Sequence, residues 1–289
     1  MDSKILRHQT AKILGTEIFY RVAGHPGNPA VLLLHGFPSS SAMFKSLMLS
    51  LSDRFYLIAP DYPGFGFSAF PGRKEFEYTF ANIARHIDGL INQLVINHFA
   101  VYLHDYGCPI GLRICLMNPK RIMGLIVQNG NAYEEGLGPQ WDETRDYWAD
   151  PTPEKAKKAA AFLTEKGTKD QYVSGLPQDM QAAIAPELYI LDWHIMSQPG
   201  RVAMQLALNT DYQDNIKMYP QFHNYFKTYQ PPALILWGRY DPFFDIQEAY
   251  CYERDLKNSS LHILEGGHMA LETNFHAVSD LMGAFLESI

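Results

Sequence analysis

Apolar residues follow two alternating patterns along this chain. Short apolar runs rich in Leu, Val, Ile and Phe, typical of buried strands, are followed by stretches in which apolar residues recur every three or four positions. The expected strands lie near residues 30–34, 54–60, 99–103, 121–128, 231–238 and 260–264. Because strands that alternate with helices usually form βαβ units, the pattern predicts a mostly parallel, twisted sheet with helices on both faces.

The middle of the chain breaks this alternation. From Asn131 to about Tyr219 no strand is expected, whereas residues 142–148, 153–166, 186–197 and 201–209 have helical spacing. We therefore predict an α/β core of residues 1–131 and 220–289, with an inserted all-helical cap of residues 132–219. The cap is rich in Tyr and Trp, which indicates an apolar cavity with a few polar tips, or else rings that simply pack the cap on the core.

Composition narrows the class of protein. The 289 residues carry a formal net charge of −7, which argues against a nucleic-acid surface, and no apolar run is as long as a membrane span. The first ten residues lack the apolar stretch of a signal peptide, and the three cysteines are far apart, as in a cytoplasmic protein with reduced thiols. No metal-ligand spacing or phosphate-binding loop is present. We expect no cofactor, no metal, no membrane and no nucleic-acid partner, and a monomer or homodimer.

Asp105 is the candidate with the most chemical consequence. It follows the strand at 99–103, precedes a helix at 110–117, and has Gly107 two places later. This is the layout of a nucleophile elbow, a tight turn that lifts one side chain above the edge of the sheet. Gly107 is expected because a Cβ there would crowd the turn. The alternative is that Asp105 caps the N-terminus of the following helix.

Three more segments place polar groups just past strands. His35-Gly-Phe-Pro38 follows the first buried strand, Asp241 follows the strand near 231–238, and His268 follows the strand near 260–264. Loops at the carboxyl ends of parallel strands meet at one edge of a sheet, where such folds build their sites. The order Asp105, Asp241, His268 is that of nucleophile, acid and base in α/β-hydrolases.

With the turn Asp61-Tyr-Pro-Gly-Phe-Gly-Phe-Ser68, these motifs make nearly the whole chain resemble α/β-hydrolases that use an aspartate nucleophile. That group includes epoxide hydrolases and haloalkane dehalogenases. The resemblance implies that Asp105 displaces a leaving group from a saturated carbon and forms an ester. His268, oriented by Asp241, then activates the water that attacks this ester. The backbone N–H groups of Phe37 and Tyr106 match the oxyanion-hole positions, where losing one donor typically costs about 3–4 kcal/mol.

The leaving group depends on the cap and on the residues around Asp105. Epoxide hydrolases use two cap tyrosines as proton or hydrogen-bond donors, and Tyr147 and Tyr212 resemble them, with plain packing as the alternative. Haloalkane dehalogenases hold halide with side-chain N–H groups, at positions that Phe37 and Tyr106 occupy here. We therefore favour an epoxide hydrolase over a haloalkane dehalogenase, and both over a binding protein that has lost turnover. The expected substrate is small and apolar or aromatic, and it reacts with water. The residues expected to line its pocket are Phe37, Tyr106, Trp141, Trp148 and Trp193.

Overall fold

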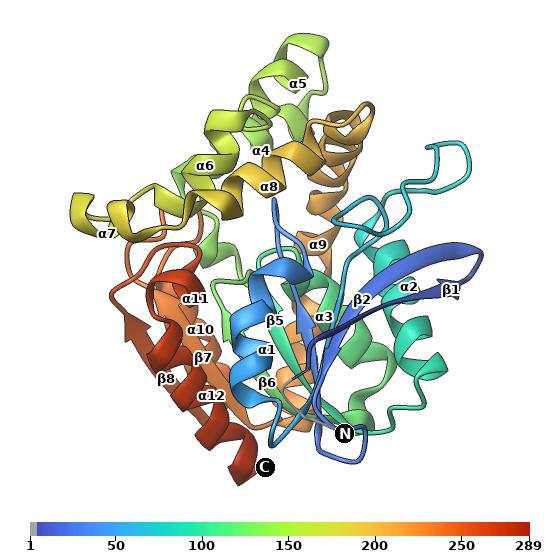
Figure 1. Cartoon of the computed structure of the whole chain (residues 1–289). Helices are drawn as coiled ribbons and strands as arrows, with labels where there is room; N and C mark the ends of the chain where they lie inside the picture. The colour runs from blue at the N-terminus through green and yellow to red at the C-terminus, as the bar shows by residue number, and fades with distance from the viewer. Residues whose placement is uncertain (1–4) are drawn as a thin grey trace.

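An eight-stranded sheet forms the centre of the computed structural model, which describes residues 5–289 (Figure 1). The strand order is β1-β2-β4-β3-β5-β6-β7-β8; β2 is antiparallel to both of its neighbours, and the sheet is parallel from β4 to β8. The strands are β1 (Arg7–Ile13), β2 (Thr16–Ala23), β3 (Ala30–Leu34), β4 (Tyr56–Pro60), β5 (Phe99–His104), β6 (Ile122–Gln128), β7 (Ala233–Gly238) and β8 (Ser259–Leu264). The predicted, mostly parallel sheet is thus confirmed.

Helices cover both faces of the sheet (Figure 1). One face packs against α1 (Lys45–Leu51) and α12 (Phe275–Ser288), the other against α2 (Phe80–Gln93), α3 (Gly107–Met117) and α10 (Gln247–Asp255). Every residue of β3 and β5 is buried, as expected of central parallel strands enclosed on two sides. The sheet therefore holds the ends of β3 and β5, and the loops after them, on a rigid base.

A group of helices lies across one end of the sheet (Figure 1). It contains α4 (Asp142–Ala149), α5 (Pro153–Ala159), α6 (Glu165–Val173), α7 (Gln178–Ala183), α8 (Pro186–Met196) and the first half of α9 (Arg201–Tyr229). A short helix, α11 (Ala270–Thr273), follows the loop after β8 on the core side. Of these helices, α4, α6 and α9 contribute to the roof of a cavity whose floor is the carboxyl end of β5.

Two expectations about the cap need correction. The single helix expected over 153–166 is two helices, because Thr164 caps α6 through a hydrogen bond from the N–H of Gly167 to its hydroxyl (3.0 Å). The helix expected over 201–209 continues for 29 residues through Pro220, so the expected boundary after Tyr219 falls inside α9. α9 begins in the cap and ends against α2, α3 and α10 of the core. One continuous helix thus belongs to both parts.

Candidate active site

Asp105 is held at a sharp turn between β5 and α3. Its φ is +48°, a backbone conformation that few residues other than glycine adopt. Gly107 is required, because a Cβ there would lie 2.3 Å from the carbonyl oxygen of Leu34. The capping alternative is wrong: α3 has no side-chain cap, and the Asp105 carboxylate instead accepts a hydrogen bond from the backbone N–H of Phe37. The turn therefore presents a carboxylate at the edge of the sheet.

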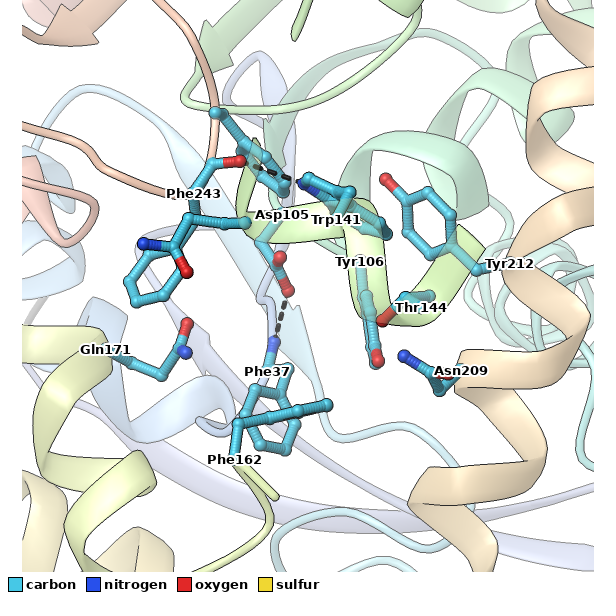
Figure 2. A pocket seen from close by; sticks show the side chains of 12 residues that line it. Phe37, Asp105, Tyr106, Trp141, Thr144, Phe162, Gln171, Asn209, Tyr212 and Phe243 are labelled. Atoms are coloured by element: carbon cyan, nitrogen blue, oxygen red, sulfur yellow. Dashed lines mark hydrogen bonds between the residues drawn. The ribbon is translucent and has the colours of Figure 1, made fainter. Parts of the chain in front are cut away.

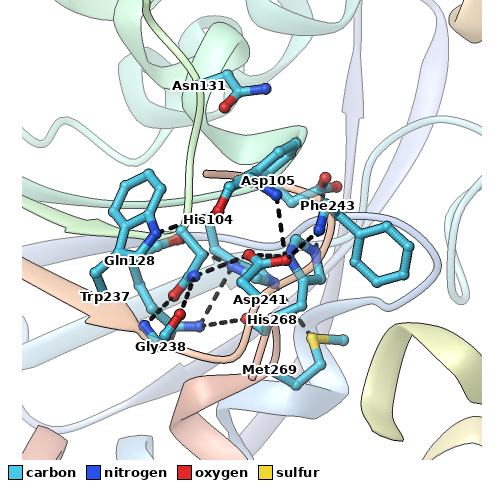
Figure 3. Close-up of polar contacts among 12 residues, drawn as sticks. His104, Asp105, Gln128, Asn131, Trp237, Gly238, Asp241, Phe243, His268 and Met269 are labelled. Atoms are coloured by element: carbon cyan, nitrogen blue, oxygen red, sulfur yellow. Dashed lines mark hydrogen bonds and ion pairs between the residues drawn. The ribbon is translucent and has the colours of Figure 1, made fainter. Parts of the chain in front are cut away.

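His268 stands between two carboxylates (Figure 3). Its Nδ1 lies 2.9 Å from Asp241 Oδ2, and its Nε2 lies 3.8 Å from Asp105 Oδ2. The side chain is 1% exposed and Nε2 has no hydrogen-bond partner, so that nitrogen is available to a molecule placed next to Asp105. The three residues expected to act together are brought together in the expected order.

Asp241 is fixed by four contacts, three of which the sequence did not reveal. Besides His268, Oδ2 accepts from Asn129 Nδ2 (2.8 Å), and Oδ1 accepts from the backbone N–H groups of Phe243 (2.7 Å) and Phe244 (3.2 Å) (Figure 3). Asn129 also accepts from the N–H of Gly238 (3.0 Å), which fixes the orientation of its amide. These donors fix the position of the Asp241 carboxylate, which in turn holds the His268 ring in one orientation.

For both Asp105 and His268, burial and neighbouring charges shift the pKa in opposite directions. Burial raises the pKa of Asp105; the positive charge of His268 and the N–H groups of Phe37 and Tyr106 oppose this only in part. Burial lowers the pKa of His268, but the charge and hydrogen bond of Asp241, together with Asp105, more than offset it, so that pKa is raised. The hydrogen bonds from Phe37 and Tyr106 to the Asp105 carboxylate are those an oxyanion hole needs.

The other nearby histidines have structural partners. His35 is buried, stacks on Tyr62 with ring centroids 4.0 Å apart, and has a pKa lowered by burial to about 4. His104 points away from the cavity: its Nδ1 lies 3.0 Å from the carbonyl oxygen of Gln128, and its Nε2 lies 3.3 Å from the sulfur of Met269. Both rings stay neutral and shape the loops around Asp105.

Above Asp105 lies a cavity of about 130 Å³ between core and cap (Figure 2). Its lining includes Phe37, Asp105, Tyr106, Trp141 and Tyr212, as expected. It also includes residues that sequence reasoning missed, namely Gln140, Thr144, Phe162, Gln171, Asn209, Phe243 and Phe244. The cavity is thus aromatic with several uncharged polar tips.

Three expected cap residues do not line this cavity. Tyr147 lines a separate surface hollow beside Asp211, so the assignment of Tyr147 as a donor over Asp105 is wrong. Trp148 stacks behind Tyr212, with ring planes at 7°, and its indole N–H donates to the carbonyl of Asn209 (2.9 Å). Trp193 of α8 packs with partial exposure on the hydrophobic core. Neither tryptophan is thus a direct substrate contact.

Helical spacing could have identified the error at Tyr147. Trp141, Thr144 and Trp148 recur at three- and four-residue spacing and face inward, toward the cavity or against Tyr212. Tyr147 precedes Trp148 by one residue, which turns it by about 100° around the helix. Helical spacing therefore places Trp141, Thr144 and Trp148 on one face of the helix and Tyr147 outside that face.

The aromatic side chains that line the cavity differ in whether their N–H or O–H group is already used in a hydrogen bond. The indole N–H of Trp141 already donates to the carbonyl of Phe243 (2.9 Å). The Tyr212 hydroxyl accepts from Asn131 Nδ2 (3.3 Å), and its own proton can go to a ligand or to the neighbouring Tyr219 hydroxyl. The Tyr106 ring lies 6.1 Å from that of Tyr212, centroid to centroid. Burial, and next the charge of Asp105, raises the pKa of Tyr106, whereas burial and then Tyr219 raise the pKa of Tyr212; both hydroxyls therefore keep their protons.

Within residues 5–289 no cluster of three or more His, Cys, Asp or Glu side chains is arranged to hold a metal ion. No helix in the same range is long and apolar enough to cross a bilayer.

Fold, turn and triad together define an α/β-hydrolase, and the comparisons with known proteins agree. The family model of the alpha/beta hydrolase fold matches residues 29–275, and the chain belongs to this family. An uncharacterized hydrolase of Saccharomyces cerevisiae is 38% identical over 95% of both chains. Epoxide hydrolase 4 of Mus musculus is 27% identical over 94% of this chain and 77% of its own length.

Solved structures of two enzyme classes share the fold. A tyrosine-to-tryptophan variant of the haloalkane dehalogenase DatA from Agrobacterium tumefaciens has a TM-score of 0.77 at 20% identity, covering 99% of this chain and 98% of its own. An epoxide hydrolase from Vigna radiata also has a TM-score of 0.77, at 19% identity, covering 98% of both chains. The fold is therefore common to both classes and does not choose between their reactions.

Proposed function

We propose that this protein is an epoxide hydrolase that works through a covalent ester on Asp105. The observation that carries the proposal is the division of labour between the two carboxylate oxygens: Oδ1 is held by the N–H of Phe37, while Oδ2 faces His268 across 3.8 Å. Oδ2 is then the nucleophile, and a water beside it, within hydrogen-bond distance of Nε2, serves the second step.

In the first step Asp105 Oδ2 attacks an oxirane carbon, the carbon–oxygen bond of the ring breaks, and its electron pair goes to the substrate oxygen. That oxygen takes a proton from a tyrosine hydroxyl of the cavity, Tyr212 or Tyr106. In the second step His268 Nε2 removes a proton from water, which attacks Cγ of Asp105. The negative charge develops on Oδ1, next to the N–H groups of Phe37 and Tyr106. Collapse of this intermediate breaks the bond from Cγ to the ester oxygen, which takes the proton of the new hydroxyl on Cγ, so that a vicinal diol leaves and the carboxylate is regenerated. The proton on His268 then returns through water to the tyrosinate, which restores both groups.

Epoxide opening is favoured over carbon–halogen cleavage by the hydrogen-bond donors of the cavity. A leaving alkoxide needs a proton, which a phenol supplies, whereas a leaving halide needs only N–H or O–H donors. The two indole N–H groups nearest the cavity are already used by the backbone carbonyls of Phe243 and Asn209. The side-chain amides of Gln140, Gln171 and Asn209 and the tyrosine hydroxyls remain as donors, but of these only a tyrosine hydroxyl can give up the proton that an alkoxide needs. The alternative is a haloalkane dehalogenase, which the likeness to dehalogenase structures supports, and in which the Tyr106 hydroxyl would face the halide.

A single turnover in heavy-oxygen water tests the covalent step. The label should enter the Asp105 side chain first, as read by mass spectrometry of the peptide that contains it, and reach the diol only in later turnovers. Label found in the first-turnover product would overturn the ester mechanism. Parallel assays of diol from epoxides and halide from bromoalkanes separate the two reactions, and turnover of neither would favour a protein that only binds.

A further inference from the structure

The cap supplies four uncharged polar side chains to the cavity. They come from four segments of the cap, the short 3-10 helix 139–141, α4, α6 and α9, and are Gln140, Thr144, Gln171 and Asn209. Within the described part of the chain, none of these side chains forms a hydrogen bond to another protein group. Asn209 is the most telling, because it is only 5% exposed and its Oδ1 is a buried atom with no partner.

Four side chains on the walls of one cavity thus have hydrogen-bonding groups that no protein group uses, and a ligand in the cavity can use them. Cap residues elsewhere on the same wall are aromatic, so apolar side chains could have closed it. Figure 2 shows Thr144 and Asn209 beside the Tyr106 ring, with Gln171 on the other side of Phe37. The polar groups thus surround the position that a substrate bound at Asp105 would occupy.

The chemistry of these groups indicates what they bind. Asp105 is the one charged residue of the cavity lining within residues 5–289, so the ligand is neutral. Figure 2 shows the side-chain nitrogen of Asn209 beside Tyr106, and Asn209 Nδ2 and the Thr144 hydroxyl can both donate to an acceptor in the cavity. The oxygen of a hydroxyl or of a carboxamide is such an acceptor. The volume of about 130 Å³ is somewhat below that of an engineered cavity of about 150 Å³ that binds benzene, so the ligand is small.

We propose that this site selects small neutral epoxides that carry a hydroxyl or carboxamide group next to the oxirane, and that Asn209 determines this specificity. The proposal rests on the proposed epoxide hydrolase function and replaces the expectation of a purely apolar or aromatic substrate. The backbone carbonyl of Asn209, bound by the indole N–H of Trp148, keeps this part of α9 in place above the cavity.

Matched pairs of substrates test the proposal. Glycidol and ethyloxirane have the same number of non-hydrogen atoms and differ in one hydroxyl, as oxirane carboxamide and isopropyloxirane differ in an amide. We expect kcat/KM to be at least about tenfold higher for the polar member of each pair. Asn209→Leu should abolish this preference, with most of the change in KM for the polar substrate.

Gln205→Leu is the matched control. Gln205 lies one turn earlier on α9, is also buried with an unpaired Oε1, but does not line the cavity. It should leave the ratio of the two kcat/KM values unchanged even if it alters stability. An equal change in both variants would mean that the effect is structural and would overturn the assignment of Asn209.

The outcome can be separated from that of the proposed function. If epoxides are hydrolysed but kcat/KM for ethyloxirane equals or exceeds that for glycidol, the proposed selection of polar substrates is overturned, whereas the proposed epoxide hydrolase function is retained. If halide is released and epoxides are not opened, the epoxide assignment fails. The same selection is then read from bromoethanol against bromopropane. If no substrate is turned over, titration with propionamide and with butanone, followed by tryptophan fluorescence, tests the selection by affinity. Propionamide should bind more tightly than butanone to the unchanged protein, and this difference should disappear in Asn209→Leu.

Discussion

The core and the cap build opposite walls of the cavity in different ways. On the core side each oxygen of Asp241 has two donors, and Oδ1 of Asp105 has the N–H of Phe37. On the cap side Thr144 and Asn209 have hydrogen-bonding capacity that no protein group uses. Donors that are already fixed in place stabilise a transition state whose charge always develops at the same atoms. Polar groups without a protein partner are instead free to bind a ligand. We therefore expect the core groups to determine the reaction and the cap groups to select the substrate.

The largest effect should come from removing the nucleophile. Asp105→Ala leaves the other core groups in place but takes away the atom that forms the ester, so steady-state turnover should fall by about 10⁴-fold or more. Diol formation by the purified variant measures this. If turnover persisted at the level of the unchanged protein, the core wall would not be the site of reaction.

Removing the base should separate the two chemical steps. In His268→Gln the carboxylate can still attack, but no group deprotonates water, so turnover should fall by about 10²–10⁴-fold while the ester accumulates. Intact-protein mass spectrometry after mixing with substrate should detect a protein heavier by one substrate molecule. An unmodified protein would show that His268 is needed before the ester forms.

The difference between the two walls also limits what sequence reasoning can find. The triad could be predicted because each member follows an apolar run, and the carboxyl ends of parallel strands meet at one edge. Leu103, two residues before Asp105, is large for such a turn; it fits because Gly111 leaves room, and a Cβ there would lie 2.2 Å from Leu103 Cδ2. Asn129, just after β6, orients Asp241, and its place in the sequence does not indicate this role.

Cap residues could not be predicted to the same depth, because helical spacing tells which face is buried but not what that face covers. Thr144 and Asn209 read as ordinary helix residues, and their role depends on how α4 and α9 pack over Asp105. Tyr147 and Tyr212 both fit the pattern of a donor, but only Tyr212 lines the cavity. Helical spacing could separate Tyr147 from the face of Trp141, Thr144 and Trp148, but it could not show which residues of that face reach the cavity.

The cap tyrosines provide the next test. Tyr212→Phe keeps the ring packed against Trp141 and Trp148 but removes the proton for the alkoxide, so kcat for epoxide opening should fall by about 10²-fold. Tyr147→Phe is the control and should leave kcat unchanged, because Tyr147 lines a different hollow. Equal losses in the two variants would contradict this assignment, and Tyr106→Phe would then identify the remaining donor.

The pH dependence should follow the core. His268 acts as a base only when neutral, and its pKa is raised, so kcat should increase as the pH rises through that pKa, about tenfold per unit on the acid side. The pKa of Tyr212 is also raised, so it should stay protonated and cause no loss on the alkaline side. Asp241→Asn removes the charge that stabilises the imidazolium form, and the acid limb should move to lower pH. An acid limb that stayed in place would assign it to another group, such as Asp105.

The smallest effect concerns how the cap sits on the core. Asp192 of α8 is 3% exposed and accepts a hydrogen bond from the Tyr172 hydroxyl (2.5 Å); burial raises its pKa to about 7. A folded-state pKa above the unfolded value of about 4 means that the folded protein binds the proton more tightly. Stability from this group is thus fully present at acidic pH and is lost as the pH rises toward 7. Asp192→Asn keeps an acceptor for Tyr172 without the charge, so Tm at pH 8 should rise by about 2–4 °C for each kcal/mol gained. The exposed Asp179→Asn on α7 serves as the control, and a Tm that rose equally in both, or at pH 4 as well as at pH 8, would show that the buried charge is not the cause.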